Sequence, residues 1–336
     1  MARFVQVARE RFALPPGTEI TVEANPRDLD AEGYRRLLDL GANRLSLGVQ
    51  SLDDGVLKEM GRSHSAADAR RAVEDARRAG FSSLNLDLIL GWPGETRERW
   101  RLGLELFLAL APDHVSLYVL EVEEKTVLAH RQQHGRLTLP DDDLVADLYQ
   151  ETVDRLAARG LDRYEISNFA RPGFESRHNG KYRDDAPFLG FGMSAHSCRH
   201  GRRWWNNDRF ATYCRAVEEG GGAAAAAGER RLTARERRAE ALFTGLRRRD
   251  GVDLAVFRKR YGLDPLACSG CSCRVGRRRS RQDRPQVRPE SVPSRRPART
   301  AAVPVNFTPA TCVPSAARRR HRTSAPRERS IDPSTP

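Results

Sequence analysis

Four polar side chains interrupt apolar segments of this 336-residue chain at a spacing that suits ligand binding. Glu23 lies in TVEANP, Gln50 closes RLSLGVQ, Arg62 lies in GRSH, and Asp87 interrupts SLNLDLIL. A carboxylate inside an apolar strand requires a partner or a ligand, because an unpaired buried charge is costly. Carboxylates accept hydrogen bonds from ribose hydroxyls or an ammonium group, and a guanidinium clamps a carboxylate. Together, the four residues indicate a zwitterionic, ribose-bearing ligand.

Each of these residues also has a purely structural explanation. Glu23 could cap the turn at the following proline, and Gln50 could cap a helix that begins just after it. Arg62 could be an ordinary surface residue, and Asp87 could pair with an internal arginine. Their occurrence at successive strand ends favours the ligand interpretation.

A repeated strand–helix pattern must position these side chains. Apolar runs predict strands at 19–24, 44–50, 83–90 and 114–120, with a short strand near 164–166. Helical periodicity predicts helices at 28–40, 66–79, 95–110 and 141–159, and Gly41 and Gly80 follow two of them as C-caps. This alternation predicts an α/β fold of parallel βα units, whose ligands bind at the C-terminal ends of the strands.

The composition changes after the βα region, which we assign to residues 1–168. Residues 169–219 are rich in glycine, aromatic residues and histidine, and the low-complexity segment 220–230 is typical of a linker. Residues 231–267 predict the start of a small helical domain, with helices at 233–248 and 252–261.

The last part of the chain, residues 268–336, is predicted to be a disordered tail. It holds sixteen arginines, four acidic residues and no leucine, whereas residues 1–267 hold 42 basic and 41 acidic residues. The tail therefore carries +12 of the net charge of +13, and the nearly neutral body implies no basic face for nucleic acid. The tail is either a basic arm or the product of a shifted reading frame in GC-rich DNA. The abrupt loss of pattern after Ala267 favours the shifted frame.

Cysteine usage and hydropathy indicate a cytoplasmic protein. Cys268, Cys271 and Cys273 could form half of a metal site, but the sequence supplies no second half, so we expect no metal there. Only Cys198 and Cys214 lie in the body, which is typical of a reducing compartment. Residues 1–11 are charged and no apolar run reaches about 18 residues, so we expect neither a signal peptide nor a membrane span.

Several segments resemble the oxygen-independent coproporphyrinogen III oxidase-like family of radical SAM proteins, and most closely its heme-chaperone members. The matching segments are TVEANP (21–26), NRLSLGVQS (43–51), GRSH (61–64), NLDLILGWPGET (85–96), YEISNFA (164–170), SRHN (176–179) and FLGFGMSAHS (188–197). The resemblance covers about residues 1–267. It implies a partial radical SAM (βα)6 barrel with about four of six βα units. It also implies S-adenosylmethionine bound by Glu23, Gln50, Arg62 and Asp87.

The heme-chaperone members carry an HNxxYW motif linked to heme, and residues 178–183 of this chain read HNGKYR. The resemblance implies that His178, Asn179 and Tyr182 contact heme, since imidazole and phenolate can be axial ligands of heme iron. Arg183 replaces the tryptophan of the motif, which puts one aromatic contact with heme in doubt. Without the family, His178 and Asn179 would be interpreted as hydrogen-bonding loop residues.

The chain also departs from the family at its beginning. Members open with two further strands and a CxxxCxxC loop whose thiolates bind a [4Fe–4S] cluster, and this sequence contains no such motif. We therefore expect a chain truncated at its N-terminus that binds no cluster and delivers no electron to S-adenosylmethionine. Whether it is an enzyme stays open.

Several functions follow as alternatives. The first is a heme chaperone that binds S-adenosylmethionine, holds a [4Fe–4S] cluster when intact, and transfers heme to acceptor proteins. The second is an oxygen-independent coproporphyrinogen III dehydrogenase of porphyrin biosynthesis. An inactive fragment is a third possibility, and a nucleic-acid-binding protein that uses the tail is a fourth.

Overall fold

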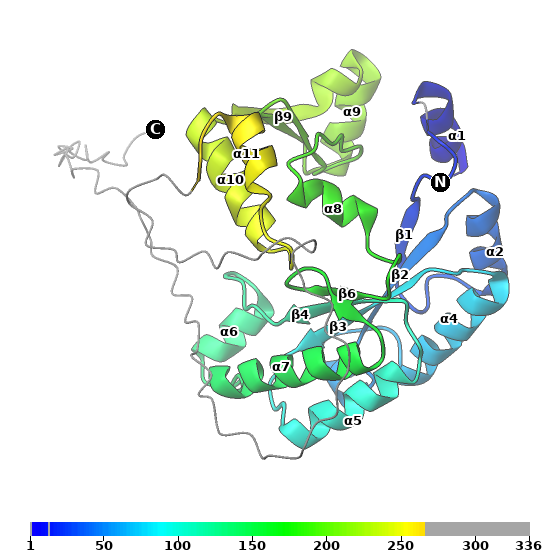
Figure 1. The fold of residues 1–336 in the computed structure, drawn as a ribbon. Helices are drawn as coiled ribbons and strands as arrows, with labels where there is room; N and C mark the ends of the chain where they lie inside the picture. The colour runs from blue at the N-terminus through cyan, green and yellow to red at the C-terminus, as the bar shows by residue number, and fades with distance from the viewer. Residues whose placement is uncertain (1, 13, 266–336) are drawn as a thin grey trace, which may run out of the picture. The chain divides into compact units, whose positions relative to one another are not determined.

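The structure is a computed structural model that describes residues 2–12 and 14–265. Its main feature is a six-stranded sheet in the order β1-β2-β3-β4-β6-β5 (Figure 1). The sheet strands are β1 (Thr21–Ala24), β2 (Arg44–Gln50), β3 (Leu84–Leu90), β4 (His114–Val119), β5 (Asp162–Arg163) and β6 (Asn168–Ala170). The first four strands are parallel, and β6 and β5 are antiparallel additions. The predicted α/β class with four parallel βα strands is confirmed.

The helices of the βα units lie along one face of this sheet (Figure 1). They are α2 (Ala31–Asp39), α3 (Asp54–Glu59), α4 (Ala66–Ala79), α5 (Arg97–Leu108) and α7 (Asp142–Ala158). Outside the βα units lie α1 (Ala2–Arg11) and α6 (Val127–Gln133). The predicted helix ends are confirmed where local chemistry defines them. Ser65 and Asp68 form a capping box at the start of α4, and Gly80 ends it at φ 116°.

Alternation along the strands divides the sheet into an apolar and a polar face. On β3, Leu84, Leu86, Leu88 and Leu90 are buried in the main hydrophobic core with residues of the surrounding helices. The residues between them include Asn85 and Asp87, which therefore project to the opposite face. The helices cover the apolar face because only that face gains free energy by leaving water.

A smaller antiparallel sheet follows the βα region. Its strands are β7 (His196–Arg199), β8 (Arg202–Asn206) and β9 (Ala226–Arg231). The helices of this part of the chain are α8 (Arg177–Arg183), α9 (Phe210–Gly220), the 3₁₀ turn η1 (Gly222–Ala225), α10 (Ala234–Leu246) and α11 (Leu254–Tyr261). The last two helices correspond to the helices predicted at 233–248 and 252–261.

Two segments differ from the sequence-based expectation. Residues 220–230, predicted to be a linker, contain η1 and most of β9, because backbone pairing with β8 does not depend on side-chain composition. A Cβ at Gly228 would lie 2.5 Å from the ring of Trp205, so glycine is needed in this strand. The strand predicted near 164–166 is instead the turn between β5 and β6.

The predicted disordered tail and its cysteines lie outside the described residues. None of the helices within residues 2–12 and 14–265 is both long and apolar enough to cross a membrane. The cytoplasmic location and the domain boundaries stay predictions.

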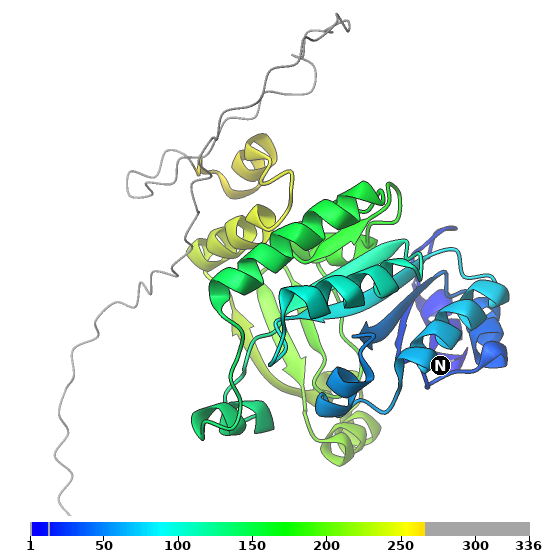
Figure 2. The same ribbon diagram turned by 90° about the horizontal axis from the view of Figure 1, so that it is seen from below.

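A buried hydrogen bond joins α5 to α7, which lie side by side in Figure 2. The indole Nε1–H of Trp100 donates to the hydroxyl of Thr152 over 2.8 Å, and both side chains are buried. The variant Thr152→Val leaves the indole donor unpaired, so we expect a loss of about 1–3 kcal/mol in the free energy of unfolding. Urea denaturation measures this loss.

The matched control, Thr152→Ser, keeps the hydroxyl and removes one methyl group, so it should cost about 1 kcal/mol. A valine variant as stable as the parent would contradict the importance of the hydrogen bond.

Candidate functional site

The polar face of the sheet lines a cavity of about 520 Å³, which we call the strand cavity. Its floor is formed by polar residues from the four parallel strands: Thr21, Glu23, Arg44, Ser46, Asn85, Asp87 and Ser116. Its other side includes Ser176, His178 and Asn179 from the start of α8. The structure thus brings two residues predicted for S-adenosylmethionine and two predicted for heme to one cavity.

A chain of hydrogen bonds fixes Asp87 in this cavity. The amide nitrogen of Asn85 donates to Asp87 Oδ1 over 2.8 Å and to Ser46 Oγ over 2.7 Å. The amide oxygen of Asn85 lies 2.5 Å from His114 Nδ1. Since that oxygen is an acceptor, Nδ1 of His114 carries the proton. Nε2 of His114 then accepts from the hydroxyl of Tyr164 over 2.8 Å.

Burial controls the protonation of this network. Burial holds the pKa of His114 well below 6.5, and the positive charge of Arg44 lowers it further. Burial raises the pKa of Asp87, although hydrogen bonds with Asn85 and Ser116 oppose the shift. Burial also raises the pKa of the Tyr164 phenol to about 12. The imidazole is therefore neutral and the phenol keeps its proton near neutral pH.

Arg44 is the unexpected member of the strand cavity. It is 7% exposed, and its Nε has no hydrogen-bond partner among the described residues. Burial lowers the pKa of its guanidinium, whereas Glu19, Asp87 and Glu23 are among the groups that raise it. Sequence reasoning missed Arg44, Asn85 and His114. The polar residues at positions 85 and 87 of β3 and 114 and 116 of β4, which alternate with apolar ones, were the available signal for Asn85 and His114.

Gln50 and Arg62 lie together at the C-terminal end of β2. A Cβ at Gly48 would lie 3.0 Å from Gln50 Nε2, 3.2 Å from Arg62 Nη2 and 3.3 Å from Asn25 Oδ1. Three polar side chains thus converge over Gly48. Ser46, two residues before Gly48 on the same face, is the register partner of Glu23, so Gln50 and the loop residue Arg62 converge on the sheet face that carries Glu23.

Gln50 has a strained backbone. Its φ is 64°, and the N–H of Ser51 donates to the carbonyl of Val49 over 2.8 Å, which makes Gln50 the centre of a three-residue turn. The left-handed region costs about 1–2 kcal/mol for a residue with a side chain. Strain of this kind is concentrated at functional sites.

The capping roles offered for Gln50 and Glu23 are taken by other residues. Asp53 caps α3 in place of Gln50, and Asp28 accepts from the backbone of Asn25 at the turn where Glu23 was the alternative. Within the described residues, the side chain of Glu23 makes no hydrogen bond. Asp87 forms no direct ion pair there, although the charge of the buried Arg44 counteracts the rise in its pKa that burial causes. Their roles in ligand binding stay predictions.

The predicted heme motif lies on α8, not in a loop. The carboxylate of Glu19 accepts from the backbone N–H groups of Arg177 and His178 over 2.9 and 3.0 Å, which fixes the start of the helix. The rings of His178 and Tyr182, one turn apart, meet edge to face with centroids 5.0 Å apart. Both side chains are exposed.

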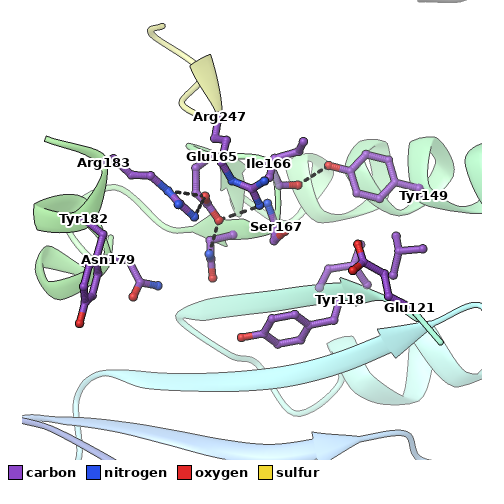
Figure 3. A pocket seen from close by; sticks show the side chains of 13 residues that line it. Tyr118, Glu121, Tyr149, Glu165, Ile166, Ser167, Asn179, Tyr182, Arg183 and Arg247 are labelled. Carbon is purple, nitrogen blue, oxygen red and sulfur yellow. Dashed lines mark hydrogen bonds and ion pairs between the residues drawn. The ribbon is translucent and has the colours of Figure 1, made fainter. Parts of the chain in front are cut away.

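A second cavity of about 650 Å³ lies beside Tyr182, and we call it the Tyr182 cavity (Figure 3). Its lining includes Tyr118, Val119, Glu121, Tyr149, Glu165, Ile166, Asn179, Tyr182, Arg183 and Arg247. Arg183 donates to the buried carboxylate of Glu165 through Nε and Nη2, at 3.1 and 2.7 Å. Tyr118 and Asn179 line both cavities, so the two cavities are neighbours.

The described residues do not fit an iron–sulfur cluster. Residues 2–12 and 14–265 contain two free cysteines, Cys198 and Cys214, and no group of three His, Cys, Asp or Glu side chains arranged to hold a metal ion. A [4Fe–4S] cluster of the radical SAM type needs three thiolates. No chemical step through such a cluster is derived from these residues.

Comparisons with known proteins agree with this geometry. The Radical SAM superfamily profile matches residues 2–107. The chain is 37% identical over 261 residues to the heme chaperone HemW of Lactococcus lactis, covering 78% of this chain and 68% of that protein. It is 39% identical over 251 residues to the heme chaperone HemW of Bacillus subtilis, covering 74% and 66%. The chain thus spans about two thirds of the length of these relatives.

A solved structure supports the fold. The coproporphyrinogen III oxidase HemN from Escherichia coli, a radical SAM enzyme, matches with a TM-score of 0.66 and 25% sequence identity. The match covers 78% of this chain and 62% of that one. The predicted radical SAM type of α/β fold is therefore confirmed.

The depressed pKa of His114 predicts a pH dependence of stability. Below about pH 6.5 the unfolded chain binds a proton at this histidine while the fold keeps it neutral, so this contribution to stability is lost as the pH falls. We expect the variant His114→Gln to show a smaller drop in Tm than the parent between about pH 7 and about pH 5.

Thermal unfolding across this pH range checks the prediction. The variant His134→Gln, at an exposed histidine that follows α6, is the control and should keep the slope of the parent. Equal slopes for the parent and His114→Gln would show that His114 is not held neutral in the fold.

Proposed function

The chain belongs to the HemW family of radical SAM proteins, and from this premise we propose that it binds heme and transfers it to acceptor proteins. The observation that carries the proposal is the pair of exposed rings, His178 and Tyr182, on one face of α8 at the junction of two cavities. Relatives that are 37–39% identical bear the name heme chaperone.

The chemistry of α8 suits transient binding of heme. An imidazole or a phenolate can coordinate heme iron, and Asn179 between the two cavities can donate to a ligand. The rings are exposed, so heme can approach and leave without a change in the core. Glu19 fixes the backbone at the start of α8, the helix that carries both rings.

We propose that S-adenosylmethionine binds along β1, β2 and β3. Arg62 would pair with the carboxylate of its methionine part, and Glu23 and Asp87 would accept from its hydroxyl or ammonium groups. Gln50 would supply an amide at the strained turn that ends β2. The radical SAM family implies a [4Fe–4S] cluster as well, and the described residues of this chain do not supply its thiolates.

The alternative function, coproporphyrinogen III dehydrogenase, has weaker support. The solved HemN structure shares the fold at 25% identity, whereas the chaperones share 37–39%.

Titration of the purified full chain with hemin, followed by its Soret absorbance, tests the proposal. We expect a shifted Soret band for the parent. The variants His178→Ala and Tyr182→Phe remove the groups that would bind iron, so each should weaken binding about tenfold. The variant His134→Ala removes an exposed histidine outside both cavities and should bind hemin as the parent does. An unchanged spectrum and affinity in both α8 variants would reject these ligands.

Variants at position 50 distinguish an effect on stability from an effect on ligand binding. The variant Gln50→Gly relieves the strain of a positive φ, so its Tm should equal or exceed that of the parent. Loss of the amide should weaken S-adenosylmethionine binding about tenfold in equilibrium dialysis. The control Gln50→Asn tolerates the same backbone conformation and keeps an amide, so its affinity should be intermediate. Full affinity in the glycine variant would exclude Gln50 from the binding site.

A further inference from the structure

We propose that the Tyr182 cavity holds the porphyrin and that Arg247 binds its carboxylate groups. This inference rests on the proposed function. It adds the cavity in which the ligand binds and a residue, outside the HNGKYR motif, that selects for acidic porphyrins. It is carried by an unpaired guanidinium in a cavity whose other arginine is already paired.

Arg247 is the C-cap residue of α10. Its Nε is buried without a hydrogen-bond partner. The guanidinium lies over the ring of Phe243, 5.9 Å from its centroid, and forms no ion pair within the described residues. Its neighbours Arg248 and Arg249 pair with Asp184 and Asp250. A buried donor without a partner costs free energy, and a ligand carboxylate would recover it. A guanidinium binds a carboxylate through two parallel hydrogen bonds.

The walls of the cavity suit the flat, apolar part of a porphyrin. Tyr118 is 49% exposed, Ile166 46% and Val119 44%, which is a large exposure for apolar and aromatic side chains gathered in one hollow. Tyr182 lies on the α8 side of the same cavity (Figure 3). Burial of these surfaces by a macrocycle would be favourable.

The acidic residues of the lining do not prevent anion binding. The Glu165 carboxylate accepts from Arg183 and from the backbone N–H of Ser167 at 3.2 Å, so its charge is compensated inside the protein. Glu121 is exposed and lies beside Tyr118, apart from Arg247 in Figure 3. An acidic edge of the ligand would therefore face Arg247 and its apolar part would face Tyr118.

The test compares two ligands on the full chain, hemin and hemin dimethyl ester, titrated in the same detergent buffer by Soret absorbance. We expect Arg247→Gln to weaken hemin binding about tenfold and to leave ester binding as in the parent. The matched control is Arg249→Gln, which removes an arginine outside the cavity and should change neither affinity. The ratio of the two affinities within one variant does not depend on the folded fraction, so partial unfolding does not obscure the result.

The outcomes separate this inference from the proposed function. If the parent gives no Soret change with either ligand, the proposed function fails. If the parent binds hemin and Arg247→Gln binds it equally well, or loses the ester as strongly as the acid, only the role of Arg247 is overturned. A tenfold preference for hemin in the parent that disappears in Arg247→Gln supports the inference.

Discussion

The buried amide of Asn85 is the contact on which the geometry of the site depends. Its nitrogen donates to Ser46 and Asp87, and its oxygen accepts from His114 and Ser116. These partners come from three neighbouring strands and use the full hydrogen-bonding capacity of a primary amide. Loss of either acceptor, Ser46 or Asp87, would leave one N–H of this buried amide unpaired at a cost of about 1–3 kcal/mol. The amide therefore fixes the register of the polar face and the direction of the Asp87 carboxylate.

The same network reaches the helix that carries the heme motif. His114 binds Tyr164, and the Tyr164 oxygen accepts from the backbone N–H of Ser176 over 3.3 Å, where α8 begins. The carboxylate of Glu19 accepts hydrogen bonds from the next two N–H groups of the helix, those of Arg177 and His178. A helix of seven residues has little stability of its own, so these contacts from outside define its position. The end of the helix is held as well, by the ion pair between Arg183 and Glu165, while the rings of His178 and Tyr182 stay exposed.

The sequence predicted the features that local chemistry determines. The strand at 44–50 and the helix at 66–79 match β2 and α4, because apolar periodicity and the caps at Ser65 and Gly80 are local signals. Arg44 could not be identified, since its burial results from strand pairing and from α8, far along the chain. Arg247 was missed for the same reason. For the segment 220–230 the composition gave a wrong prediction. It indicated a linker, whereas the backbone of this segment pairs with β8.

Of the two arginines that line the Tyr182 cavity, Arg183 is the one that pairs with the Glu165 carboxylate. The motif that this chain resembles has tryptophan at this position, whereas this chain has an arginine whose guanidinium binds the Glu165 carboxylate. The Glu165 side chain is 1% exposed, so an unpaired charge there would be strongly destabilising. A tryptophan could not compensate that charge, and Arg247 would be the other guanidinium in the lining able to do so. Arg183 therefore removes one aromatic contact from the motif but leaves the charge of Arg247 available to a ligand.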